Sequence, residues 1–237
     1  MTTREQLLSP LLFDNSGHMQ ILPAPFGAAL NGAAMFGVME VSLERPRTEL
    51  SPELRQDEFG LLWNTAEKAS HPEKSPIQTI ADLTVYRFPA VREDFIRERV
   101  DTFWDAPPEA LRICTIYGPC LARAEALAGQ ERFLLAMRKE PAFAHALLYR
   151  ICEYDLRVID MAMQFDFDGF KLVETWLDTD SAPLTLPLWR EFLKPYLVRL
   201  YAMIKAYHKP VIQSGKSANT AFAEELNELG VDILELS

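Results

Sequence analysis

The sequence contains little cysteine, little histidine and no long apolar run. Three cysteines and four histidines occur among 237 residues, and no two cysteines form a C-x-x-C pair. An odd number of scattered cysteines favours reduced thiols over a disulfide framework, so we expect a cytoplasmic protein. No apolar stretch reaches the roughly 18 residues that a membrane helix needs, and the N-terminus does not resemble a secretion signal. We therefore expect neither a membrane-bound nor a secreted protein.

Basic residues are also scarce relative to acidic ones. Lys plus Arg total 24 against 34 for Asp plus Glu, which gives a net charge of −10. Such a charge repels phosphate backbones and anionic membrane surfaces, so neither is an expected partner. The glycine-rich nucleotide loops G-x-x-x-x-G-K-[ST] and G-x-G-x-x-G are absent as well. Half of the residues (49%) are hydrophobic, which is enough for one large domain spanning residues 1–237.

Secondary structure becomes readable after an irregular N-terminal segment, residues 1–50. Residues 51–91 carry Pro, Asp and Ser between short apolar stretches, which favours short strands and a hairpin. From residue 111 onward, apolar β-branched runs alternate with long segments of three- and four-residue apolar spacing. We predict strands at 111–119, 168–175, 209–214 and 231–236, and helices at 92–105, 121–140, 141–165, 187–208 and 219–229.

Strands that alternate with helices indicate an α/β protein with a parallel sheet. In such folds the chemistry lies at the carboxyl ends of the strands. This rule selects the segments 117–120, 174–180, 213–217 and 235–237. Tyr117 is the substrate-facing candidate in the first segment, whereas the neighbouring Cys120 is interpreted as a structural thiol.

Two carboxylates follow the predicted strand 168–175. Glu174 and Asp178 have the position expected of catalytic acids or of groups that orient a substrate. The alternative is that they cap the helix that follows or pair with surface cations. Trp176 lies between them and has two readings too: it stacks on a flat ligand, or it covers the core.

The segment "QSGKS" follows the strand at 209–214 and forms a tight polar turn. Gln213, Ser214 and Lys216 are candidates for substrate binding, because backbone N–H groups and a lysine at such a turn can receive an anion. The competing interpretation is an ordinary turn in which Ser217 or Asn219 caps the next helix.

Several motifs from residue 51 to the end resemble the uroporphyrinogen decarboxylase superfamily. They are "DG" at 168–169, "PLWREFLKPY" at 187–196, "KPV" at 209–211 and "GVD" at 230–232. "DEFGLLWN" at 57–64 and "LTVYRFPAV" at 83–91 are similar to the branch of cobalamin-dependent methyltransferases and O-demethylases. The resemblance implies a (β/α)8 barrel with its site at the carboxyl ends of the strands.

The resemblance also indicates what is missing. Methyltransferases of this branch carry His-x-Cys after the Lys-Pro-Val strand to bind zinc, whereas Gln213 or Ser214 replaces the His here and Gly215 or Lys216 replaces the Cys. We therefore expect no metal there, and Lys216 supplies a fixed cation instead. Only four clear parallel strands are readable, so either the early segment supplies further strands or the barrel is incomplete at the C-terminal end.

The resemblance implies a methyltransferase-like protein that acts on a small methylated substrate. A corrinoid is then the implied cofactor, and a corrinoid protein is an implied partner. One alternative is a tetrapyrrole enzyme of the decarboxylase type, which belongs to porphyrin metabolism. The other is a non-catalytic homologue that binds a ligand or a partner, or that associates with a second copy through an exposed strand edge.

Overall fold

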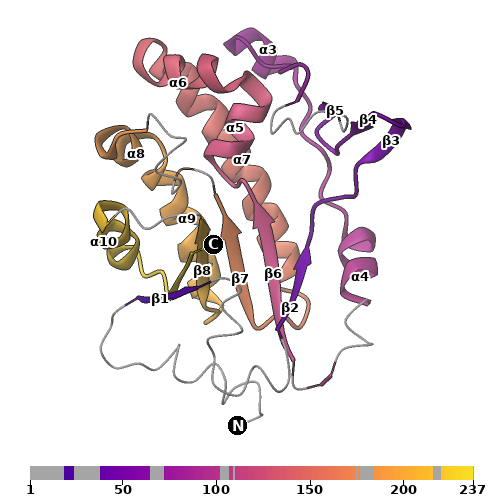
Figure 1. Cartoon of the computed structure of the whole chain (residues 1–237), viewed down its shortest axis with the longest axis vertical. Coiled ribbons are helices and arrows are strands. Elements are labelled where there is room, and N and C mark those ends of the chain that lie inside the picture. Colours follow the sequence, from indigo (N-terminus) through magenta and orange to yellow (C-terminus); the bar gives the residue numbers. More distant parts are fainter. Residues whose placement is uncertain are drawn as a thin grey trace.

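Six parallel strands form the main sheet of the protein, which confirms the α/β class (Figure 1). The computed structural model describes residues 19–23, 38–64, 72–101, 107–108, 110–174, 176, 184–215 and 220–236. Within them the strand order is β1-β9-β8-β7-β6-β2. The bounds are β1 (Gln20–Pro23), β2 (Val38–Ser42), β6 (Leu111–Tyr117), β7 (Gly169–Val173), β8 (Val211–Gly215) and β9 (Ile233–Leu236).

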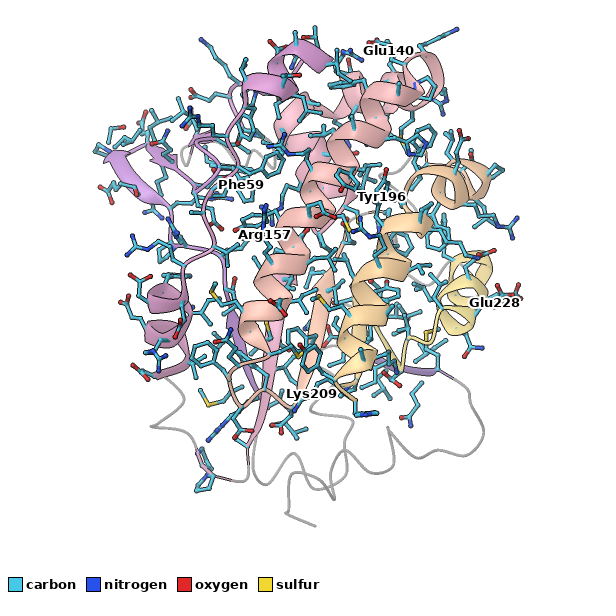
Figure 2. The ribbon with its side chains drawn as sticks, turned by 180° about the vertical axis from the view of Figure 1, so that it is seen from behind. Phe59, Glu140, Arg157, Tyr196, Lys209 and Glu228 are labelled. Carbon is cyan, nitrogen blue, oxygen red and sulfur yellow. The ribbon has the colours of Figure 1, made fainter. Side chains whose placement is uncertain are left out.

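Helices cover one face of this sheet. In Figure 1 helices α7 and α9 lie behind the strands, and in Figure 2, which shows the opposite side, they lie in front of them. We call the face turned away from α7 and α9 the inner face. The helices after β6 are α5 (Leu121–Ala128), α6 (Gln130–Lys139), α7 (Pro141–Ala162), α8 (Leu186–Phe192), α9 (Lys194–Ala206) and α10 (Thr220–Glu228).

Two of the predicted long helices are each divided in two. The segment 121–140 breaks at Gly129, whose φ of 87° is readily adopted only by a residue without a side chain. The segment 187–208 breaks at Leu193, and Pro195 lies in the first turn of α9, where its missing N–H costs no helical hydrogen bond.

Apolar side chains occupy both faces of the sheet, but in unequal numbers. The helix-facing side belongs to the large core, which includes Cys114, Leu172 and Leu234. The inner face carries a small separate cluster of buried residues, formed by Leu111, Ile113, Ile212 and Ile233. Because side chains alternate along a strand, polar residues at the same parity also point to the inner face.

A second, three-stranded antiparallel sheet precedes β6. It consists of β3 (Thr48–Ser51), β4 (Leu54–Gln56) and β5 (Leu62–Asn64), which confirms the predicted hairpin. Phe59 anchors it to α7, because its ring lies 5.1 Å from that of Tyr154, and Tyr86 donates a hydrogen bond to the Phe59 carbonyl at 2.6 Å (Figure 2). Two further helices follow, α3 (Ile80–Val85) and α4 (Glu93–Asp101).

The expected eight-stranded ring is not closed among the described residues. Strand β1 pairs only with β9, and β2 pairs only with β6, so the two strands form the edges of a six-stranded sheet. The early segment does supply strands that the sequence pattern did not reveal, namely β1 and β2. None of the helices within the described ranges combines the length and the apolar character needed to cross a membrane.

Candidate functional site

Glu174 lies directly after β7 and is bound by the first turn of α5. Its Oε1 accepts hydrogen bonds from the backbone N–H groups of Cys120 at 2.5 Å and Leu121 at 3.0 Å, and its Oε2 accepts one from Ala122 at 3.3 Å. The side chain is 3% exposed. A carboxylate at a helix N-terminus satisfies donors that have no partner within the helix and complements the helix dipole. These contacts make Glu174 a helix cap, although the capped helix is α5, which precedes Glu174 in the chain, and not the following helix that the alternative named.

Trp176 is packed into an aromatic cluster. Its ring centroid lies 5.4 Å from those of Trp189 and Phe222, and the residue is only 1% exposed. A side chain buried in this way covers the core, as the second reading of the sequence had it. It presents no open face on which a flat ligand can stack.

Gln213 and Ser214 point to opposite sides of β8. The Gln213 side chain faces the helices, where its Oε1 accepts a hydrogen bond from the Tyr201 hydroxyl at 2.6 Å and its Nε2 donates to the Leu172 carbonyl at 3.0 Å. Ser214 is paired in register with Glu235 on β9 and faces the inner side. Because the side chains of adjacent strand residues point to opposite faces, only Ser214 of the two lies on the inner face.

A buried ion network crosses the inner face. Lys171 Nζ of β7 lies 2.9 Å from Glu40 Oε1 of β2 and 2.6 Å from Glu235 Oε2 of β9. Thr115 of β6 reaches Glu40 Oε2 at 3.5 Å. Lys171 is 8% and Glu235 1% exposed, whereas the Glu40 side chain is 28% exposed. Glu40 is therefore the most accessible carboxylate of this network.

The network keeps its lysine charged. Burial lowers the pKa of Lys171, but hydrogen bonds to Glu235 and Glu40 outweigh this effect, and the net pKa is raised. One cation and two anions thus give these three side chains a net charge of −1.

Tyr117 ends β6 and lines a cleft of about 180 Å³ between this strand end and the three-stranded sheet. The residue is 44% exposed. Arg123 of α5 forms a wall of the cleft: it donates to the Tyr117 carbonyl at 2.6 Å and to Glu44 at 2.8 Å, and its guanidinium lies 4.2 Å from the Phe59 ring centroid. Tyr117 and Thr115 are two residues apart on β6, so their side chains point to the same face of the sheet. The cleft therefore adjoins the inner face.

Two predicted site residues, Asp178 and Lys216, lie outside the described residues. Conversely, sequence reasoning missed Glu40, Thr115 and Lys171. The available signal was Lys171 itself, a charged residue inside the apolar strand "GFKLV". A buried lysine of this kind needs a partner.

The cysteines do not fit a thiolate metal site. Cys114, Cys120 and Cys152 are all 0–1% exposed. Burial raises the pKa of each thiol, to about 12 for Cys152 and well above its usual range for Cys120, where Glu174 adds to the effect.

The fold and site define an α/β protein with a six-stranded parallel sheet and with polar side chains at its inner face and strand ends. The chain belongs to the uroporphyrinogen decarboxylase family, because the family model "Uroporphyrinogen decarboxylase (URO-D)" matches residues 58–237. This agrees with the resemblance inferred from the motifs.

Two individual proteins are similar to the chain. A uroporphyrinogen decarboxylase from Geobacillus thermodenitrificans (strain NG80-2) is 26% identical over 100 residues, which are 42% of this chain and 28% of that protein. A methyltransferase from Methanosarcina mazei superposes with a TM-score of 0.62 at 15% identity, over 98% of this chain and 75% of that one. The first match spans well under a third of the decarboxylase, and the second establishes the fold alone.

Proposed function

We propose that the protein is a methyltransferase-like member of the uroporphyrinogen decarboxylase family that binds a small methylated compound at its inner face. The observation that carries the proposal is the Lys171 network, in which one buried ammonium fixes Glu40 and Glu235 across three strands. Glu40, the more accessible carboxylate, would contact the substrate. Ser214, the register partner of Glu235, would lie beside it.

The charge of this face favours a neutral or cationic ligand over a polyanion. Among the described strands of the main sheet, Lys171 is the one basic residue whose side chain points to the inner face. Two carboxylates, Glu40 and Glu235, neutralise its charge. A porphyrinogen with eight carboxylates would meet net negative charge there. A fixed carboxylate suits a methylated ammonium group or a hydroxyl donor instead.

Glu40 would orient the substrate, because it is the carboxylate of the network that a ligand can reach most easily. Lys171 would act as a positioning residue, because both carboxylates already occupy its donors. Asp178 and Lys216 stay predicted contributors to the same site. A catalytic role for Glu174 competes with its hydrogen bonds to α5.

A corrinoid would accept the methyl group in this proposal. The cleft beside Tyr117, at about 180 Å³, is too small to enclose such a macrocycle, so we derive no step through it. A corrinoid protein that docks at the strand ends stays part of the proposal, as does association of two copies.

A thermal-shift panel tests the proposal, because a ligand that binds only the folded state raises its apparent stability. The panel contains trimethylammonium, dimethylammonium, methoxyacetamide, hydroxocobalamin and uroporphyrin. We expect at least one small methylated compound to raise Tm, and uroporphyrin to leave it unchanged.

The matched variants are Glu40→Gln, which should lose the shift with methylated ammonium ions, and Glu49→Gln, an exposed glutamate on β3 that should keep it. Stabilisation by uroporphyrin alone would favour the tetrapyrrole alternative. A panel without any shift would favour the non-catalytic homologue.

A further inference from the structure

The cleft beside Tyr117 has a distinctive balance of charges. Two of its acids are paired within it: Glu44 with Arg123 at 2.8 Å, and Glu58 with Arg45 at 3.8 Å. Since these arginines already face carboxylates, they offer little attraction to a further anion. What the cleft can bind is decided by its remaining charged side chains.

The third acid of the cleft, Asp57, holds neighbouring residues of the cleft in place through hydrogen bonds. Its Oδ1 accepts the backbone N–H groups of Phe59 and Leu61, both at 2.9 Å, and its Oδ2 accepts the indole N–H of Trp63 at 2.8 Å. Three donors therefore satisfy this carboxylate. The contact with the indole fixes the orientation of the Trp63 ring, which lines the cleft.

Arg47 rests on that ring. Its Cζ lies 3.8 Å from the Trp63 ring centroid, so the planar guanidinium is held by a cation–π contact. The structure gives this guanidinium no hydrogen-bond or ion-pair partner within the ranges it describes. Stacking leaves the N–H donors at the edge of the group available, and Arg47 lines the cleft. It is a pre-oriented cation at the entrance to an otherwise balanced site.

We propose that this cleft binds the carboxylate of a small molecule on Arg47, with the rest of the molecule extending along Tyr117 toward the inner face. A monoanion fits better than a phosphate dianion, because Glu44 and Glu58 line the same cleft. The volume of about 180 Å³ limits the ligand to a small molecule.

The carboxylate site adds to the proposed function, and only the recognition of the methyl group rests on that proposal. A substrate with a carboxylate at one end and a methylated oxygen or nitrogen at the other would contact Arg47 and Glu40 respectively. The carboxylate contact can hold or fail independently of methyl recognition.

The test compares three probes by ligand-observed NMR titration of the whole chain: methoxyacetate, its neutral analogue methoxyacetamide, and acetate. A charge-assisted contact to guanidinium should make methoxyacetate bind about tenfold more tightly than the amide. Arg47→Gln should abolish this preference. Arg157→Gln, which changes an exposed arginine on α7 outside the cleft, should preserve it.

The remaining outcomes separate the two proposals. Equal binding of acid and amide, or no binding of either acid to the folded wild type, would overturn the carboxylate site. Equal affinities for acetate and methoxyacetate, both lost in Arg47→Gln, would support the carboxylate site and contradict recognition of the methyl group. Thermal unfolding of Arg47→Gln checks that the variant is folded, and Trp63→Phe, which retains an aromatic ring, should keep the preference.

Discussion

Glu174 accepts a 2.5 Å hydrogen bond from the backbone N–H of Cys120, which joins the carboxyl end of β7 to the start of α5. The two residues lie 54 positions apart in the chain. This contact makes Glu174 part of the scaffold that joins the ends of β6 and β7, while its catalytic role stays a prediction. It also places a buried negative charge next to α5, with consequences for stability and pH dependence.

Replacing Glu174 should destabilise the protein. Glu174→Ala leaves three backbone donors of α5 without their acceptor, and we expect the free energy of unfolding to fall by about 1–3 kcal/mol. Glu174→Gln keeps one acceptor oxygen and should lose less. Thermal unfolding measures both, with Glu49→Ala on exposed β3 as the control. Wild-type stability combined with lost ligand binding in Glu174→Ala would instead indicate a functional acid.

Removing the inner-face lysine should be more damaging. Lys171→Met removes the cation that contacts the buried Glu235 and the more accessible Glu40, and the expected loss in the free energy of unfolding is about 3–5 kcal/mol at pH 7. Because the pKa of Lys171 is raised, the wild-type network stays intact at neutral pH and weakens only as pH rises through that pKa.

The double variant Lys171→Met/Glu235→Gln, measured by the same thermal unfolding, should recover part of the lost stability. The exposed Lys139→Met on α6 should change stability by less than about 0.5 kcal/mol. If Lys171→Met were no less stable than Lys139→Met, the ion network would not contribute to the fold.

Glu125 should make stability depend on pH. Burial raises the pKa of this carboxyl to about 7, with the negative charge of Glu174 adding to the effect. A raised folded-state pKa gives stability that is present at low pH and is lost as pH rises from about 4 to 7. Glu125→Gln should therefore match the wild type near pH 4 and exceed it by about 1–3 kcal/mol at pH 8. Parallel Tm–pH curves for the two proteins would rule out this titration.

Gly169 is tightly enclosed by its neighbours. A Cβ at this position would lie 2.9 Å from Pro210 Cγ and 3.3 Å from Ile113 Cδ1. Gly169→Ala should cost about 1–3 kcal/mol through overpacking, measured by chemical or thermal unfolding. Pro210→Ala in the same chain should return part of the loss. An unchanged Tm in Gly169→Ala would show that the residues around position 169 move apart enough to accommodate the added methyl group.

The strands from β6 to β9 could be predicted because each is a local apolar run bounded by glycine, proline or a helical pattern. Strands β1 and β2 could not, since they lie among small and turn-forming residues, and β1 is completed only by pairing with β9 at the other end of the chain. The hydrophobic pattern is local, whereas strand pairing is not.

The site was harder to predict for the same reason. Lys171 and Glu40 are 131 residues apart, so nothing near either residue indicates the pair. Gln213 and Ser214 were grouped as one polar turn, but the alternation of the strand separates them. Glu174 was correctly placed at a strand end, yet the helix that it caps begins 53 residues earlier.

The most direct test of methyl transfer at the inner face is product analysis by mass spectrometry. Wild-type protein, Glu40→Gln and Glu49→Gln are each incubated with the methylated compounds that raise Tm and with free reduced cobalamin, which is added as an external methyl acceptor. We expect the demethylated product with the wild type and Glu49→Gln, and at least tenfold less with Glu40→Gln. Equal product from all three proteins, or none from the wild type despite bound ligand, would contradict the proposed function.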